Sequence, residues 1–239
     1  MNWYLDLRRV LVVFPSLLRY FLCNSFAIGR SILTGAGRCV MMTANKRIGG
    51  VLSMSASTTI HLLGIAGSLR RASHNRGLLR AASALLPPDV QLHTFDLAPI
   101  PLYNFDLEKD LPAAVQAFKD AIAAAGGLLI ATPEYNWSMS GVLKNALDWA
   151  SRPPKESVLR GKPAAMMGAG GISGTIRAQG HLRQFAAFTG IQLLETPQVA
   201  VARSWEKFDS DGNLIDDSIR PDIAALLTAL ADFIRQETA

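Results

Sequence analysis

The chain has 239 residues, of which 49% are hydrophobic, and this is enough for one sizeable core. Its formal charge of +5 belongs to residues 1–53, which hold seven basic side chains and one acidic, whereas residues 54–239 hold 17 basic and 18 acidic. This near-neutral part excludes the broad basic surface of a nucleic-acid-binding protein. Both cysteines, Cys23 and Cys39, also lie in residues 1–53, so a disulfide framework, a zinc site and a thiol nucleophile are excluded from the rest of the chain.

Residues 1–58 differ in kind from the rest of the chain. Two apolar runs, Val10–Leu18 and Tyr20–Ala27, are separated by Arg19, so neither reaches the roughly 20 apolar residues of a membrane-spanning helix. No clean cleavage site of an export signal comes after them. We expect residues 1–58 to be a disordered or non-native extension, with translation starting at Met54; a targeting or membrane-surface role is the alternative. The main domain is then expected to span residues 59–239, in the cytoplasm and not at a membrane.

From residue 60 onward, short apolar runs alternate with stretches of helical periodicity. The runs predict strands at Ile60–Ala66, Val90–Phe95, Gly127–Thr132 and Pro163–Gly168, and an extended segment at Ile191–Val201. The periodic stretches predict helices at Asn75–Leu86, Pro112–Ala124, Gly141–Ala150, Ser173–Thr189 and Ile219–Gln236. Because strands alternate with helices and the central strands are apolar throughout, we expect an α/β fold: a doubly wound, five-stranded parallel sheet with helices on both faces. Such sheets bind ligands beyond the carboxyl ends of their strands.

The segment after the first predicted strand, residues 67–75, is suited to a phosphate group. It leads into a helix, whose first N–H groups lack partners and carry partial positive charge. Ser68, Ser73 and Asn75 add short hydrogen-bonding side chains, and the guanidinium of Arg70 can hold two phosphate oxygens. The alternative is a helix cap at Ser73 or Asn75 beside solvated arginines. A Walker A motif and a dinucleotide fingerprint are both absent, so a mononucleotide phosphate is the better match.

Two further loops are expected at the same edge of the sheet. The loop at residues 132–141 offers aromatic side chains and main-chain groups to a flat ring, and the glycine-rich turn at residues 168–171 lets a ligand approach the backbone. Core packing of Tyr135 and Trp137, and an ordinary strand-to-helix turn, are the alternatives. The candidate ring-binding residues are Pro133, Glu134, Tyr135, Asn136, Ser138, Gly168, Gly170 and Gly171.

Two motifs stand in these loops: Gly67-Ser68-Leu69-Arg70-x-x-Ser73-x-Asn75 and Thr132-Pro133-Glu134-Tyr135-Asn136-x-Ser138-x-x-Gly141-x-Leu143-Lys144-Asn145-Ala146-x-Asp148-Trp149. In them, and over residues 60–236, the chain resembles the NADPH-dependent FMN reductase family, and within it the bacterial NAD(P)H quinone, chromate and azo-dye reductases. The resemblance implies a flavodoxin-like fold, with FMN as cofactor and NADPH or NADH as cosubstrate. It also implies a homodimer or homotetramer in which the predicted helix Gly141–Ala150 contributes to the subunit interface.

The resemblance assigns roles to the loops. It implies that Ser68, Arg70, Ser73 and Asn75 hold the FMN phosphate. It further implies that residues 133–136 wrap the edge of the isoalloxazine ring with Ser138 nearby, while the turn at residues 168–171 flanks the ring. His74 is a departure, since family members often carry an aromatic residue there, and it leaves the local packing open.

The implied function is oxidation of NAD(P)H and reduction of quinones or similar small acceptors (azo, nitro, chromate) by ping-pong hydride transfer. Because the flavin carries the chemistry, we expect no catalytic side chain and no metal, and we interpret Glu134 as a backbone-orienting or interface residue. The segment Asp209–Asn213 superficially resembles a calcium loop, but the required acidic ligands are missing in that register, so an Asp-Gly turn is expected. The alternatives are a flavodoxin-like electron carrier and a non-catalytic flavin-binding sensor or partner domain.

Overall fold

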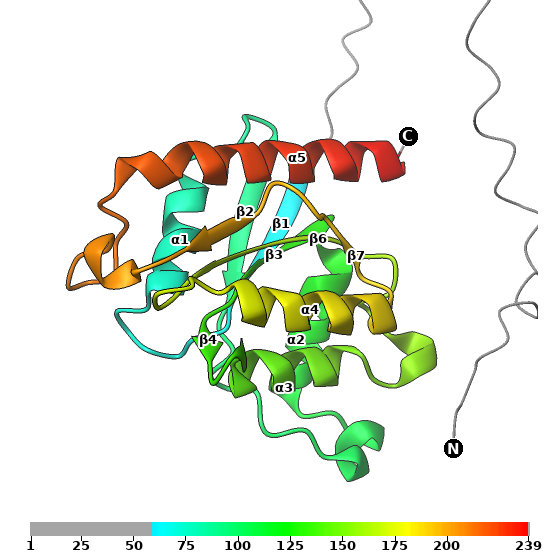
Figure 1. Cartoon of the computed structure of the whole chain (residues 1–239). Helices are drawn as coiled ribbons and strands as arrows, with labels where there is room; N and C mark the ends of the chain where they lie inside the picture. The colour runs from blue at the N-terminus through cyan, green and yellow to red at the C-terminus, as the bar shows by residue number, and fades with distance from the viewer. Residues whose placement is uncertain (1–58, 239) are drawn as a thin grey trace, which may run out of the picture. The chain divides into compact units, whose positions relative to one another are not determined.

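A computed structural model describes residues 59–238 (Figure 1). Its central sheet consists of β1 (Ile60–Ala66), β2 (Val90–Phe95), β3 (Gly127–Ala131), β6 (Pro163–Ala169), β7 (Gln192–Leu193) and β8 (Val199–Val201). The order across the sheet is β2-β1-β3-β6, after which both β7 and β8 pair with β6, and every pair is parallel. A separate antiparallel hairpin joins β4 (Glu134–Tyr135) to β5 (Ser138–Met139).

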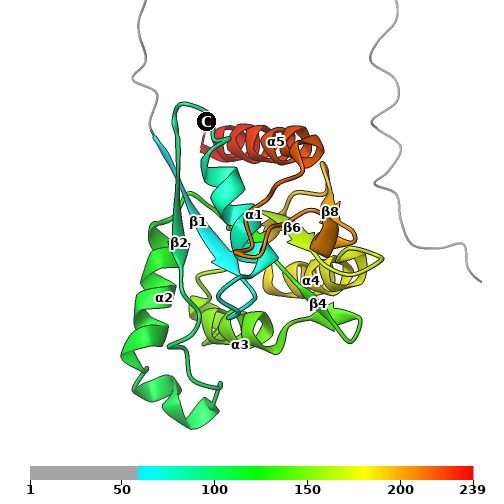
Figure 2. The ribbon, with the colours of Figure 1, turned by 90° about the vertical axis from the view of Figure 1, so that its left-hand side faces the viewer.

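Helices cover both faces of the sheet (Figures 1 and 2). One face carries α1 (His74–Ser83) and α5 (Arg220–Thr238). The other carries α2 (Ala113–Ala124), α3 (Gly141–Ala150) and α4 (Ile176–Thr189). Short 3-10 helices stand in the connections: η1 (Phe105–Lys109), η2 (Pro154–Glu156), η3 (Ser204–Glu206) and η4 (Asp217–Ile219). This is the doubly wound arrangement that alternating strands and helices predict.

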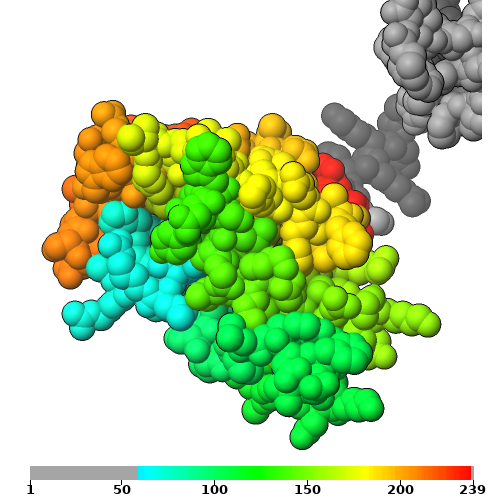
Figure 3. Space-filling model, turned by 60° about the horizontal axis from the view of Figure 1, so that its bottom comes forward, coloured from blue at the N-terminus to red at the C-terminus, as the bar shows by residue number. Residues whose placement is uncertain are grey.

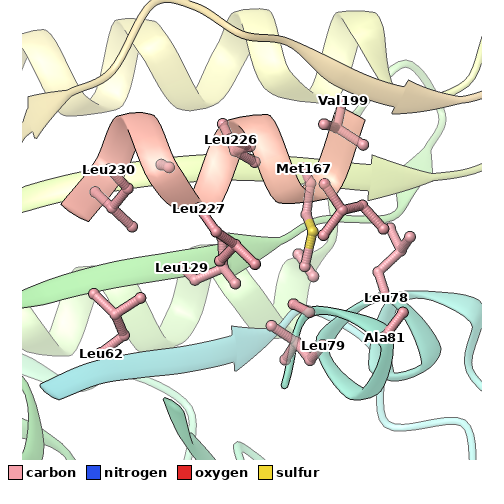
Figure 4. Packing of buried hydrophobic residues seen from close by; sticks show 14 of the residues in the cluster. Leu62, Leu78, Leu79, Ala81, Leu129, Met167, Val199, Leu226, Leu227 and Leu230 are labelled. Atoms are coloured by element: carbon pink, nitrogen blue, oxygen red, sulfur yellow. The ribbon is translucent and has the colours of Figure 1, made fainter. Parts of the chain in front are cut away.

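Each face of the sheet has its own hydrophobic cluster, because successive residues of a strand point to opposite faces. In β1, Leu62 belongs to the α1–α5 cluster and Leu63 to the α2–α3–α4 cluster; in β3, Leu129 and Leu128 divide in the same way. Figure 4 shows the first cluster, in which sheet residues pack against leucines of α1 and α5. The strands are therefore buried on both faces, which explains their continuous apolar runs.

The last position of the sheet differs from the prediction. The segment Ile191–Val201 forms not one strand but two short ones, β7 and β8, which pair with different parts of β6. Pro197 lies between them, and because proline lacks the N–H that a ladder requires, the segment leaves the sheet there. The other predicted strands and helices are confirmed, with shifts of a few residues at their ends.

We expected residues 1–58 to be a disordered or non-native extension; these residues lie outside the part of the chain that the structure describes. Among the helices of residues 59–238, none is long and apolar enough to cross a membrane.

Helix α1 packs directly on the turn that precedes α5. In this turn Phe208 and Leu214 pair, and the Asp209 carboxylate accepts bonds from the N–H groups at positions 211 and 213, as expected for an Asp-Gly turn. A Cβ atom on Gly77 of α1 would lie only 1.9 Å from the carbonyl oxygen of Gly212. The missing side chain of Gly77 thus allows α1, and the loop at its N-terminus, to lie against this turn.

We predict that Gly77→Ala lowers the free energy of unfolding by about 1–3 kcal/mol, because the added methyl group forces the helix and the turn apart. The control is Gly180→Ala in α4, where a Cβ atom would meet nothing within 4 Å. There, alanine should raise the free energy of unfolding by about 0.5–1 kcal/mol, since a helix interior favours it over glycine. Urea unfolding of both variants measures the difference, and equal effects would contradict the close packing of α1.

Candidate functional site

Three loops meet at the carboxyl ends of β1, β3 and β6 (Figure 2), and hydrogen bonds hold them together. The N–H of Gly67 donates to the carbonyl of Ala131 (2.9 Å), and the Ser140 hydroxyl donates to the carbonyl of Gly67. The N–H of Thr132 donates to the carbonyl of Met167 (2.9 Å). The first loop is therefore bound to the second, and the second to β6, from whose end the third loop starts, so hydrogen bonds within the protein hold the three loops together.

The first loop presents a cluster of unpartnered donors. Within residues 59–238, the main-chain N–H groups of residues 68–72, His74 and Asn75 donate to no protein acceptor. The Ser73 hydroxyl is 1% exposed and caps α1 by accepting a bond from its first turn, so its hydrogen remains free to donate. The Ser68 hydroxyl, on a side chain 5% exposed, likewise has no protein partner among the described residues. Unpartnered donors close together at a helix N-terminus fit a phosphate group.

Two arginines near this loop have different roles. Arg70 is exposed and forms no ion pair within the described part of the chain, so its guanidinium can reach an anion at the loop. Arg76, in contrast, donates from Nε to the carbonyl of Ser68 (3.1 Å) and pairs with Asp96 (2.9 Å). Arg76 thus stabilises the backbone of the loop. The sequence did not indicate this role of Arg76.

Asn75 has a structural role that the sequence did not reveal. Its Nδ2 donates to the carbonyl of Ala169 and its Oδ1 accepts from the N–H of the same residue, both at 3.0 Å. The side chain is 3% exposed. The Asn75 amide thus joins the start of α1 to the end of β6, and only its second Nδ2 hydrogen remains for a phosphate.

His74 makes an aromatic contact with the turn that precedes α5. Its ring stacks on Phe208, with centroids 4.6 Å apart and planes 8° from parallel, and its Nδ1 lies 2.9 Å from the Ser204 hydroxyl. Burial lowers the pKa of His74 from the ordinary 6.5; the charge of Arg70 lowers it further, and that of Asp209 opposes the shift. The ring therefore favours the neutral form.

In the second loop, Glu134 orients backbone, as predicted. Its carboxylate accepts bonds from the N–H groups of Arg177 (3.0 Å) and Ala178 (3.1 Å) and from the Arg177 guanidinium (3.3 Å). The residue before α4, Thr175, provides no side-chain cap. Glu134 is thus the N-terminal cap of α4 supplied from another segment, and its negative charge lies at the positive end of the helix.

The remaining candidates of the second loop are divided between the interior and the surface. Pro133 is buried, whereas Tyr135 is 55% exposed and Asn136 is exposed too. The Ser138 hydroxyl lies 2.9 Å from Nδ1 of His181 in α4, so its nearest partner is part of the protein. A ring lying on this loop would therefore meet Tyr135 and Asn136 first.

The three glycines of the third loop serve different purposes. Gly168 lies within β6, and a Cβ there would be 2.4 Å from the carbonyl oxygen of Thr132, so this glycine permits close packing. A Cβ at Gly170 would be 2.4 Å from the carbonyl oxygen of Gly174. Only at Gly171 is the space open, with nothing within 4 Å of a Cβ. Close approach of a ligand to the backbone is thus possible at Gly171.

Comparison with known proteins identifies the family. The sequence pattern of the NADPH-dependent FMN reductase family matches residues 60–206. The chain belongs to this family. An NAD(P)H-dependent FMN reductase of Pseudomonas aeruginosa is 48% identical over 182 residues, covering 75% of this chain and 98% of that protein. A 2-hydroxy-1,4-benzoquinone reductase of a Burkholderia species is 43% identical over 172 residues, covering 72% and 94%.

A solved structure agrees with this assignment. FerB, a flavoenzyme NAD(P)H:acceptor oxidoreductase of Paracoccus denitrificans, is 31% identical with a TM-score of 0.68, and the match covers 74% of this chain and 98% of FerB. The predicted flavodoxin-like fold, the membership of the FMN reductase family, the enzyme class and the FMN and NAD(P)H cofactors are thereby confirmed. The roles of individual residues stay predictions.

Sequence reasoning missed the β4–β5 hairpin and its contacts with α4. Asn136 favours a left-handed turn, which was a usable signal, but Trp137 beside it is not a turn residue and obscured the pattern. The contact between Glu134 and Arg177 joins residues 43 positions apart, so no local pattern could have shown it.

We predict that Glu134→Ala lowers the free energy of unfolding by about 1–3 kcal/mol, because two N–H groups of α4 lose their acceptor. Glu156→Ala is the control: Glu156 is exposed and forms no ion pair in the described chain, so its loss should change stability by less than about 0.5 kcal/mol. Urea unfolding measures both. If the two variants were equally stable, Glu134 would not cap α4.

A second prediction concerns pH and uses His74→Phe, which keeps a ring on Phe208 and removes the titratable group. Because the folded-state pKa of His74 lies below the unfolded value of 6.5, protonation favours the unfolded state. Wild-type stability should therefore fall, relative to the variant, as pH decreases through 6.5 to the folded-state pKa, and the difference should be constant at still lower pH. Unfolding of the flavin-free proteins between about pH 8 and pH 5 tests this; parallel stability curves would contradict it.

Proposed function

We propose that the loop cluster binds FMN and that the enzyme passes electrons from NAD(P)H to quinones or similar small acceptors. The observation that carries the proposal is the cluster of unpartnered N–H groups at residues 68–72, 74 and 75, with the Ser68 and Ser73 hydroxyls and Arg70 around it. A phosphate monoester would accept these donors together. The P. aeruginosa and Burkholderia relatives, named as an FMN reductase and a benzoquinone reductase, support this choice of cofactor and acceptor.

The ring of the cofactor would lie along residues 133–136 and against the turn at residues 168–171. The N–H group of Asn136 has no acceptor within residues 59–238, and the residue is exposed. This group can donate to the polar edge of the ring and stabilise negative charge there. Glu134 keeps the hairpin in place through its bonds to α4.

Bound FMN supplies hydride acceptance and release. The overall reaction is NAD(P)H plus quinone plus a proton, giving NAD(P)⁺ and hydroquinone. The chain's own part is to hold the phosphate, to orient the ring and to leave one side of it open to both substrates in turn. This hydride transfer requires no acid–base side chain of the protein. His181, a titratable residue near the hairpin, is paired with the Ser138 hydroxyl.

A second copy of the chain is part of the proposal, as is a cytoplasmic location. A groove of about 490 Å³ lies between α3 and α4 and includes Lys144, Phe185 and Phe188, of which Phe188 is 91% exposed. Burial of the Phe188 ring against a second copy would be favourable, because it removes apolar surface from water. The involvement of α3 agrees with the interface that the family resemblance implies, and a homodimer or homotetramer would cover this groove.

We predict that Arg70→Ala weakens FMN binding by about tenfold to a hundredfold, the loss expected for charge-assisted bonds to a phosphate. Arg71→Ala is the control, because Arg71 is exposed on the same loop but has no assigned contact. Titration of the flavin-free protein with FMN, followed by quenching of flavin fluorescence, gives both affinities. If Arg70→Ala and Arg71→Ala had equal affinities, the phosphate assignment would be wrong.

Steady-state oxidation of NAD(P)H by the FMN-loaded protein tests the activity itself. We expect turnover with NAD(P)H and a quinone. Bound FMN without turnover would identify an electron carrier, and a protein that takes up no FMN would overturn the proposal.

A further inference from the structure

The turn of the β4–β5 hairpin places a tryptophan where glycine is the usual residue. Asn136 and Trp137 are the two central residues of this turn, and their φ angles are 49° and 65°. Two left-handed residues in a two-residue hairpin form a type I′ turn, whose second central position is usually glycine. Asparagine tolerates this conformation, but a bulky residue there is strained. The strain at Trp137 calls for a role that a glycine would not provide.

The Trp137 indole is not part of the core. Its side chain is 69% exposed, and one face of its ring is covered by the Arg177 guanidinium at 4.5 Å. Arg177 is itself held by bonds to the Ser173 hydroxyl (2.7 Å) and to the Glu134 carboxylate (3.3 Å). The indole is thus held from one side by a cation–π contact, while no ring or cation of residues 59–238 covers its other face, which is open in this part of the chain.

The hairpin that carries this indole is fixed to α4. Glu134 at its start binds the first N–H groups of α4, and Ser138 at its end contacts His181 on the same helix. In Figure 3 the green surface that includes the hairpin lies against the yellow surface of the α4 region. The open face of Trp137 therefore belongs to a rigid arm at the carboxyl end of the sheet.

We propose that the open face of Trp137 is the surface on which a planar acceptor stacks while it is reduced. The inference rests on the proposed function, in which the adjoining residues 133–136 line the edge of the flavin ring. Stacking needs only a flat ring and tolerates variation in polar substituents. Trp137 therefore selects planar quinones as a class over acceptors that have no flat ring.

The reduction at this surface is a two-electron step. The quinone receives two electrons and one proton as a hydride that originates from NAD(P)H, and a second proton comes from water, which gives the hydroquinone. Trp137 takes no part in the electron or proton transfer and acts as a specificity-determining residue.

The test compares two acceptors in Trp137→Gly, Trp137→Phe and the wild type, all loaded with FMN. Glycine relieves the left-handed strain, so this variant should fold at least as stably as the wild type. We expect the ratio of kcat/KM for 1,4-naphthoquinone to kcat/KM for ferricyanide to fall about tenfold in Trp137→Gly, the size of one aromatic stack. In Trp137→Phe, which keeps an aromatic face, the ratio should stay within about twofold.

A binding measurement separates this role from a structural one. Isothermal titration calorimetry of the FMN-loaded proteins with 4-hydroxycoumarin, a planar analogue that is not reduced, should show about tenfold weaker binding to Trp137→Gly than to Trp137→Phe. An unchanged acceptor ratio in Trp137→Gly, or equal losses in both variants, would overturn the role of Trp137 and leave the proposed function intact. A protein that binds no FMN would overturn both.

Discussion

The paired hydrogen bonds between the Asn75 amide and the main chain of Ala169 are the contact on which the site depends. They are buried, and they join the N-terminus of α1 to the end of β6 across residues 94 positions apart. A lost partner in such a buried pair costs about 1–3 kcal/mol per orphaned group, more than the usual net gain of one bond. This contact therefore fixes the distance between the donor cluster at residues 68–75 and the glycine turn after β6, the two ends of the same site.

The electrostatics of the site are local, because residues 54–239 are close to neutral. Positive potential comes from unpartnered N–H groups at the start of α1, from Arg70 and from the dipole of the helix. At helix α4, on the other face of the sheet, the same kind of potential is neutralised internally, since the Glu134 carboxylate accepts its first N–H groups. Of these two helix N-termini, one is left for an anionic ligand and the other is occupied by the protein itself.

The sequence is sufficient to predict features that depend on local chemistry or on burial. Strands buried on both faces have continuous apolar runs, so they can be identified. A candidate phosphate loop has its donors within nine residues, so the sequence can suggest it, and its role stays a prediction. Contacts between distant segments cannot be identified in this way. The sequence suggests the Asn75 amide as a phosphate ligand, because nothing local indicates its bond to Ala169. The β4–β5 hairpin escapes prediction for a related reason, since each strand has two residues and Trp137 disguises the turn. Pro197, in contrast, does mark in the sequence the point where the last extended segment divides.

The two ends of the site differ in exposure, and this difference suits an enzyme that keeps its cofactor and exchanges its substrates. At the phosphate end, the Ser68 and Ser73 side chains are almost fully buried, and the donors are held in place by capping and by Arg76. At the ring end, Tyr135 and Trp137 are mostly exposed. Preorganised donors lower the entropic cost of binding and so favour retention, whereas an open aromatic surface allows rapid exchange of many flat molecules. In the function proposed here, tight binding at one end and weak, tolerant binding at the other would arise from the same three loops.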